Sequence, residues 1–180
     1  MMIRTFVSVP VPMTDEISEI LSDLKSIKGI RVSPPGQIHL TLKFLGDTDE
    51  KKVVKLCQSL KDSLVGRESF DVVIEGIGAF PNERNPKVIW LGIKEPNTLK
   101  EIAGVVGACV KDLNIKADDK SFSPHMTVGR VNYKTDLEDV FLNNKKKMFC
   151  NFRCDHIDVM KSELTPKGAI HSIIESIPLD

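Results

Sequence analysis

Two short segments of the chain repeat one pattern of chemically active residues. His39 and Thr41 lie in HLTLKFLG, and His125 and Thr127 lie in HMTVGR. The chain has 4 histidines, so half of them occur in matching His-x-Thr contexts. Successive side chains of a β-strand alternate between its faces, so each histidine shares a face with its threonine. Apolar residues fill the other face, which indicates two strands that bury one face and present a polar site on the other.

Two imidazoles and two hydroxyls suit an in-line displacement at phosphorus. An unperturbed imidazole has a pKa of about 6.5, so one ring can accept a proton from the attacking oxygen while the other protonates the leaving oxygen. The threonine hydroxyls can donate hydrogen bonds to the non-bridging phosphate oxygens. Such a site needs no metal or other cofactor, and the chain lacks the carboxylate-rich clusters of two-metal phosphatases. The pattern alone does not say which histidine is the acid.

Two cations adjoin the motifs. Strict alternation places Lys43 on the histidine face, as a candidate contact for phosphate, although a solvated strand lysine fits equally well. Arg130 follows the second motif, but alternation places it on the apolar face. It can therefore reach a substrate only from a β-bulge or from the end of the strand.

Four other ring-bearing residues are expected outside the site. His156 and His171 have no threonine two residues later and are interpreted as ordinary strand histidines. Trp90 is flanked by apolar residues, and Phe44 alternates away from His39, so both are expected in the core.

Length and composition limit the class of protein. The chain has 180 residues, of which 41% are hydrophobic and 28% charged, as in ordinary globular proteins. We expect one two-lobed domain over residues 1–180. Lys+Arg and Asp+Glu number 25 each, so a nucleic-acid ligand would need a local basic cleft. No apolar run has membrane-spanning length, and the 4 cysteines lack zinc-site spacing, which favours a cytoplasmic, monomeric protein with reduced thiols.

The periodicity predicts strands alternating with helices. Apolar spacing indicates helices over residues 14–27, 49–64 and 97–113, with a short helix or loop over 137–148. Strands are predicted over residues 3–9, 38–45, 69–80, 87–93, 123–131, 154–164 and 169–177. Hairpin-like pairs mixed with helices favour an α+β fold with mostly antiparallel sheet. Each His-x-Thr strand follows a helix and a proline-containing turn, so two related halves would face each other across a central groove.

The chain resembles the two-histidine phosphoesterase superfamily and, within it, the RNA 2′,3′-cyclic phosphodiesterases, also called 2′-5′ RNA ligases. The resemblance rests on HLTLKFLG and HMTVGR, with support from IRTFVSVPVP, PKVIWLGI and MKSELTPKGAIH. It implies two pseudo-symmetric lobes with helices on the outer faces and both motifs in a central cleft. It also implies hydrolysis of the 2′,3′-cyclic phosphate end of a tRNA-like RNA to a 2′-phosphomonoester, with reversible 2′-5′ joining in some members.

The same resemblance implies a role for each motif residue. His39 would protonate the leaving oxygen, His125 would activate water, and Thr41 and Thr127 would hold the phosphate. One departure is His171, which stands where the family often has tyrosine.

Three other functions fit parts of the pattern. The same chemistry could act on a small cyclic nucleotide, such as an ADP-ribose cyclic phosphate. A non-catalytic module that binds RNA ends is a second alternative, although a pure binder has no reason to prefer imidazole over lysine or arginine. A histidine metal site is a third, but two imidazoles lack the third nearby ligand of catalytic zinc sites.

Overall fold

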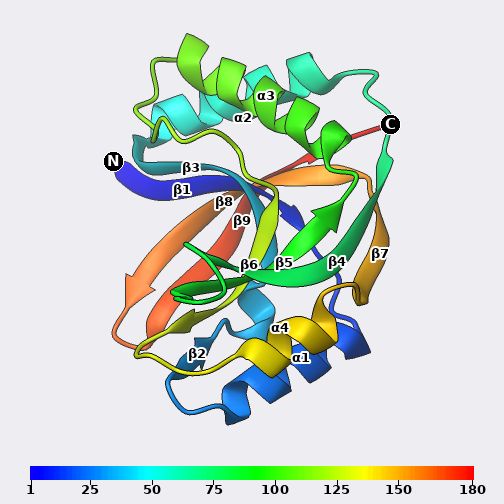
Figure 1. Ribbon diagram of the computed structural model, residues 1–180. Coiled ribbons are helices and arrows are strands. Elements are labelled where there is room, and N and C mark those ends of the chain that lie inside the picture. Colours follow the sequence, from blue (N-terminus) through cyan, green and yellow to red (C-terminus); the bar gives the residue numbers. More distant parts are fainter.

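The computed structural model describes residues 1–180 and contains two antiparallel β-sheets and four α-helices (Figure 1). The first sheet contains, in spatial order, β3 (His39–Asp49), β1 (Met2–Pro10), β8 (His156–Thr165) and β9 (Gly168–Pro178). The second sheet contains β2 (Ile30–Val32), β6 (His125–Val131), β5 (Val88–Lys94), β4 (Phe70–Phe80) and β7 (Met148–Cys154). The predicted α+β class is confirmed.

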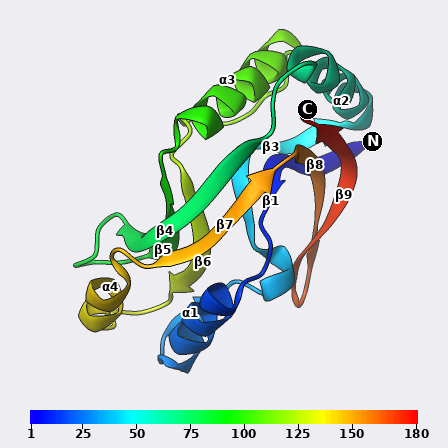
Figure 2. The same cartoon turned by 90° about the vertical axis from the view of Figure 1, so that its right-hand side faces the viewer.

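The helices form two pairs at opposite ends of the molecule. One end has α2 (Glu50–Leu64) and α3 (Asn97–Asp112), and the other has α1 (Asp15–Ser26) and α4 (Glu138–Asn144), as both views show (Figures 1 and 2). A short 3-10 turn, η1 (Pro35–Gln37), precedes β3. Each sheet is therefore covered by two helices, as the two-lobe prediction requires.

Two of the helices link the sheets. The helix α1 leads from β1 of the first sheet to β2 of the second, and it contacts β2 and β7 of the second. The helix α3 connects β5 and β6 of the second sheet, but it contacts α2 and β3 of the first. Together these helices tie the two sheets to each other.

The start of α1 shows how local sequence and tertiary packing agree. The Thr14 hydroxyl accepts a hydrogen bond from the Ile17 amide at 3.2 Å, as expected of a threonine N-cap. The same hydroxyl donates to the Phe149 carbonyl of β7 at 2.5 Å. The cap therefore both begins the helix and fixes it to the second sheet.

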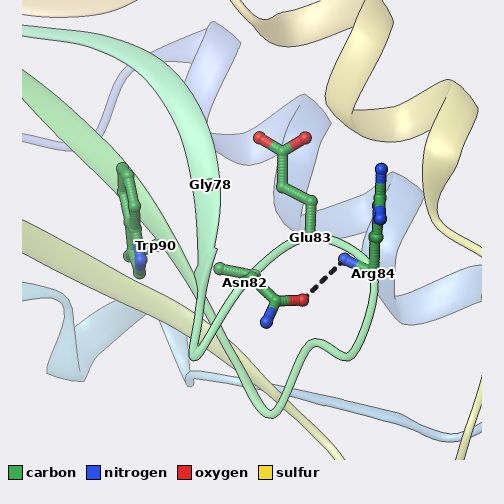
Figure 3. A pocket seen from close by; sticks show the side chains of 6 residues that line it. Gly78, Asn82, Glu83, Arg84 and Trp90 are labelled. Carbon is green, nitrogen blue, oxygen red and sulfur yellow. Dashed lines mark hydrogen bonds between the residues drawn. The ribbon is translucent and has the colours of Figure 1, made fainter.

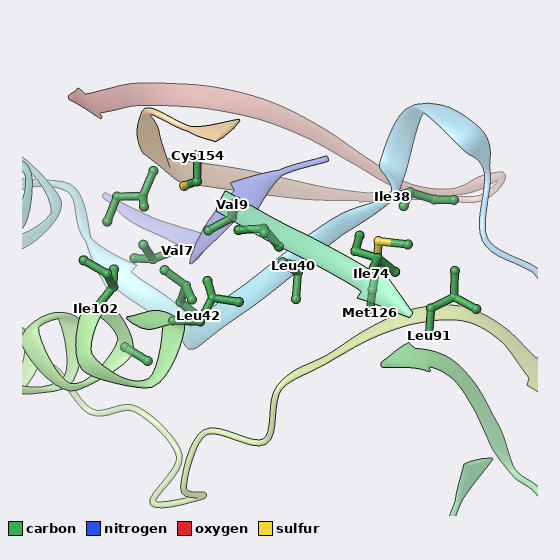
Figure 4. Packing of buried hydrophobic residues seen from close by; sticks show 14 of the residues in the cluster. Val7, Val9, Ile38, Leu40, Leu42, Ile74, Leu91, Ile102, Met126 and Cys154 are labelled. Atoms are coloured by element: carbon green, nitrogen blue, oxygen red, sulfur yellow. The ribbon is translucent and has the colours of Figure 1, made fainter. Parts of the chain in front are cut away.

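One hydrophobic cluster of 39 buried residues extends through both sheets. Figure 4 shows Val7, Leu40 and Leu42 of the first sheet in the same region as Leu91 and Met126 of the second. Leu40 and Met126 are the neighbours of the two motif histidines and have no exposed surface. The apolar residue that follows each motif histidine is therefore buried, which leaves the other face of the strand start for polar side chains.

Two strands were not predicted from the sequence. The strand β2 has only three residues and pairs along β6, and β7 pairs with β4 over residues that follow the helix or loop predicted up to residue 148. A strand of three residues is too short for a clear alternation, so the pairing of β2 is decided by β6.

An irregularity in β3 overturns two predictions about its faces. The pairing of β3 with β1 skips Leu42, which is an extra residue in a β-bulge. Phe44 consequently pairs with Phe6 and is 55% exposed, and its predicted place in the core is wrong. Lys43 pairs with Val7, whereas Thr41 pairs with Ser8, the next residue of β1, so the predicted place of Lys43 on the histidine face is also wrong.

No helix of the structure is both long enough and apolar enough to cross a lipid bilayer.

Stability should depend on the inner face of α2. Leu56 has no exposed surface, whereas Val54, two residues earlier, is 70% exposed. We expect Leu56→Ala to lower the free energy of unfolding by about 2–5 kcal/mol because it leaves a cavity. The control Val54→Ala should change it by less than about 0.5 kcal/mol. Urea unfolding measures both, and equal effects would contradict the packing described.

Candidate active site

The first motif occupies the start of β3. His39 pairs with Pro10 and Thr41 with Ser8 across β1, and both motif side chains are half-buried. The Phe6 ring, from the same β1 strand, stacks on the His39 ring with centroids 4.8 Å apart. The imidazole is therefore held by an aromatic contact while part of it remains accessible.

The second motif occupies the start of β6. The β5 partners of His125 and Thr127 are Gly92 and Trp90, so both motif residues lie on the Trp90 face of the sheet. Phe80 of β4 packs its ring edge to face against His125, with centroids 4.9 Å apart. Each catalytic candidate is thus supported by a phenylalanine from a neighbouring strand.

The tautomer of His125 follows from its backbone contact. Its Nδ1 lies 2.6 Å from the Ser123 carbonyl, which can only accept a hydrogen bond. Nδ1 therefore carries the proton, and in the neutral ring Nε2 has the free lone pair. This arrangement makes Nε2 of His125 a proton acceptor.

A β-bulge in β6 decides the position of Arg130. Thr127 pairs with Trp90 and Gly129 with Ile89, so Val128 is the extra residue. Beyond the bulge Arg130 pairs with Val88, which shares a face with Trp90 because it lies two residues away on β5. Arg130 therefore lies on the same face as Thr127. A β-bulge was one of the two ways in which the sequence analysis allowed Arg130 to reach a substrate.

The chain passes from one sheet to the other immediately before His39. After β2, the Ser33 amide donates to the Val128 carbonyl at 2.8 Å, and the Ser33 hydroxyl approaches the Thr127 carbonyl at 3.5 Å. Six residues after Ser33, His39 begins β3 in the other sheet, and β3 contacts β6. The two motif strands are thus neighbours although they belong to different sheets.

Lys43 connects the first motif strand to the loop that leads into the second. Its ammonium donates to the Asp118 carbonyl at 2.7 Å and lies 3.7 Å from the Asp118 carboxylate. The contact helps to position the segment before His125. Contact between Lys43 and phosphate stays a prediction.

A third histidine joins the first motif. The His171 ring of β9 packs edge to face against His39, with centroids 5.2 Å apart, and contacts Phe6 at 4.9 Å. Its buried Nδ1 has no hydrogen-bond partner. We interpreted His171 from the sequence as an ordinary strand histidine because no threonine follows it two residues later. Its distance from His39 along the chain gave no sign of the contact. His156, in contrast, lies 2.5 Å from Asp155.

Burial and the second imidazole together disfavour a charge on His39. Burial lowers the pKa of His39, and repulsion by His171 lowers it further, to about 4, while a hydrogen bond with the Gln37 backbone opposes the shift. Burial also lowers the pKa of His171. The His39 ring of the free protein is therefore neutral at pH 7.

A hollow of about 440 Å³ adjoins the second motif (Figure 3). Trp90 lines one side of it, and Asn82, Glu83 and Arg84 of the β4–β5 loop line the other. A Cβ at Gly78 would collide with the Trp90 indole, so this glycine lets the ring lie against β4. Trp90 is partly exposed on the His125 face, and its predicted place in the core is wrong.

The structure contains no group of three or more His, Cys, Asp or Glu side chains that could hold one metal ion.

The sequence is similar to known proteins. Residues 7–90 match the family described as LigT like Phosphoesterase. A protein of Archaeoglobus fulgidus named RNA 2′,3′-cyclic phosphodiesterase is 34% identical over 93% of this chain and 96% of its own length. A protein of Methanothermobacter thermautotrophicus with the same name is 30% identical over 97% of this chain and 98% of its own.

Solved structures share the fold. A crystal structure of a Thermus thermophilus protein has a TM-score of 0.81, at 26% identity, covering 98% of this chain and 97% of its own. Escherichia coli LigT complexed with 3′-AMP has a TM-score of 0.78 at 18% identity, over 99% of both chains. The two-sheet fold with paired His-x-Thr strands is thus that of a phosphoesterase. Within this class, the chain belongs to the LigT-like phosphoesterase family.

The contact between the two imidazoles should be visible in their titration. We expect His39 to titrate near pH 4, and His171→Gln to move its pKa upward because a repelling positive charge is removed. The Hε1 resonance in an NMR titration reports each value. A His156→Gln variant serves as the control, and an unchanged His39 pKa in His171→Gln would contradict the coupling.

Proposed function

We propose that the protein hydrolyses the terminal 2′,3′-cyclic phosphate of RNA to a 2′-phosphomonoester without a metal ion. The observation that carries the proposal is that the two His-x-Thr strands, which belong to different sheets, are neighbours, and that each carries a half-buried imidazole. Near-full-length relatives that bear the name RNA 2′,3′-cyclic phosphodiesterase support the substrate. We also propose that residues 1–180 act as one two-lobed domain, because α1 leads from one sheet to the other and α3 joins strands of the second sheet but packs on the first.

His125 serves as the general base. Its Nδ1–H donates to the Ser123 carbonyl, which leaves the Nε2 lone pair to accept a proton from water. The water oxygen then forms a bond to phosphorus, opposite the leaving oxygen.

His39 serves as the general acid. As the P–O3′ bond breaks, its imidazolium gives a proton to the 3′ oxygen, and the phosphate remains on the 2′ oxygen. Burial makes the imidazolium a strong proton donor, since it lowers the pKa of His39. The negative charge of the bound cyclic phosphate favours the protonated ring, so substrate binding itself prepares the acid.

The remaining polar groups hold the phosphate. Thr41 and Thr127 are half-buried beside the two histidines and donate hydrogen bonds to the non-bridging oxygens. Arg130 lies on the face of Thr127 and neutralises charge on the phosphate. A 5′-hydroxyl of a second RNA can replace water in the same geometry, and its attack with loss of O3′ forms a 2′-5′ bond reversibly.

The test uses a short RNA ending in a 2′,3′-cyclic phosphate, incubated in EDTA. Wild type should form the 2′-monophosphate, and His39→Ala and His125→Ala should each lose at least about 100-fold in kcat, as is usual for a general acid or base. His156→Ala is the matched control and should retain activity. Chromatographic separation of 2′- and 3′-monophosphate identifies the leaving oxygen. No turnover by wild type on this RNA or on adenosine 2′,3′-cyclic phosphate would refute the proposed enzyme and favour a binding module.

The threonines should contribute less than the histidines. Thr41→Val and Thr127→Val keep the side-chain shape and remove one hydrogen bond to a charged group, which is worth about 1.5–3 kcal/mol. We expect kcat/KM to fall roughly 10- to 100-fold in each variant. Steady-state kinetics on the same RNA measures this, and unchanged kinetics would show that the hydroxyl does not touch the phosphate.

A further inference from the structure

Two arginines stand directly opposite each other on the face that carries the second motif. Arg31 of β2 pairs with Arg130 of β6, and opposed residues of an antiparallel pair project from the same face. Arg130 in turn shares that face with Thr127, because of the Val128 bulge. Arg31 therefore extends the polar face of the site by one more strand, to the edge of the sheet.

Neither arginine is neutralised by a carboxylate. None of the ion pairs in the structure includes Arg31 or Arg130, and both residues are exposed. Like charges opposite each other destabilise a strand pair. The arrangement is unfavourable without anions and becomes favourable when phosphate groups bind at the two guanidinium groups.

Arg31 also reaches toward the first sheet. Its Nη2 lies 3.8 Å from where a Cβ of Gly168 would be, at the β8–β9 turn. Beside this turn lies a hollow of about 390 Å³, whose lining includes Gln37 and Lys167. The Arg31 guanidinium therefore approaches the turn of the opposite sheet, in a region that contributes a further cation.

Arg31 lies beyond the groups that act on the cyclic phosphate. Along β5, the partner of Arg130 is two residues from that of Thr127 and four from that of His125, roughly 7 and 13 Å at the rise of a strand. Arg31 is one strand further away. An anion at Arg31 is therefore a different phosphate from the one attacked, and a polynucleotide supplies such a phosphate at its next linkage.

We propose that Arg31, next to Arg130 and its contact with the cyclic phosphate, binds the phosphodiester on the 5′ side of the terminal nucleotide and so makes the enzyme prefer an RNA strand to a small cyclic nucleotide. Guanidinium groups suit this task because their paired N–H donors match two phosphate oxygens. The proposal rests on the proposed function, since it names the substrate class for the same site.

The test compares one variant on two substrates, a short RNA ending in a 2′,3′-cyclic phosphate and adenosine 2′,3′-cyclic phosphate. For Arg31→Gln, the loss of kcat/KM on the RNA should exceed the loss on the mononucleotide at least tenfold, mainly through KM. Arg31→Glu should widen this ratio, and Arg31→Lys should restore part of it. Arg153→Gln is the matched control, because Arg153 lies on β7 at the far edge of the same sheet.

The salt dependence of substrate affinity is a second measurement, and it would not change if Arg31 had a purely structural role. Each phosphate contact contributes close to one unit to the slope of log affinity against log salt concentration. The slope for the RNA substrate should therefore fall by about one in Arg31→Gln and stay unchanged for the mononucleotide.

Equal losses on both substrates, or no loss on either, would overturn the proposal while leaving the proposed function intact. If wild type turns over neither substrate, the proposed function fails, and binding then tests the arginine pair by itself. Fluorescence anisotropy with an RNA ending in a 2′-phosphate, against competition by adenosine 2′-monophosphate, should still show weaker RNA binding for Arg31→Gln. Equal RNA affinity of wild type and variant would overturn the inference in that case too.

Discussion

The packing of α1 and α3, which link the two sheets, is the constraint on which the site depends. The helix α1 leads from the first sheet to the second and packs on the second, and α3 joins two strands of the second sheet but packs on the first. Their apolar faces can be buried only if both sheets are present and correctly placed. The burial that stabilises each half therefore also holds β3 and β6 as neighbours, so one hydrophobic cluster fixes the relation between two histidines far apart in the chain.

Single extra residues in β3 and β6 decide which side chains lie on the face of the site. An extra residue in β6 brings Arg130 to the face of Thr127, and an extra residue in β3, Leu42, brings Phe44 to the open face and takes Lys43 away from it. A bulge adds one residue to one strand and reverses the alternation beyond it. The bulge in β6 thus adds a cation, Arg130, to the face of its motif, whereas the bulge in β3 removes one, Lys43. The cation that stays on a motif face therefore lies beside the second motif.

The electrostatic environments of the two motif histidines differ in kind. His39 packs against Phe6 and His171, which also contact each other, and both burial and the second imidazole lower its pKa. His125 has its Nδ1–H fixed by a backbone carbonyl and lies on a face with two unneutralised arginines further along it. The difference provides a physical basis for assigning unlike roles to residues that the sequence presents as copies.

The sequence by itself determined the paired His-x-Thr strands, the buried apolar face behind each, the α+β class and the family. These follow from short-range periodicity, because two residues of one strand keep their relation wherever the strand is placed. Only the tertiary structure brought His171 against His39 and placed Arg31 opposite Arg130, and it moved Phe44 and Trp90 out of the predicted core. The physical reason is that alternation predicts a face only while the ladder is unbroken, and that contacts between strands depend on pairing partners and bulges, which a single strand does not encode.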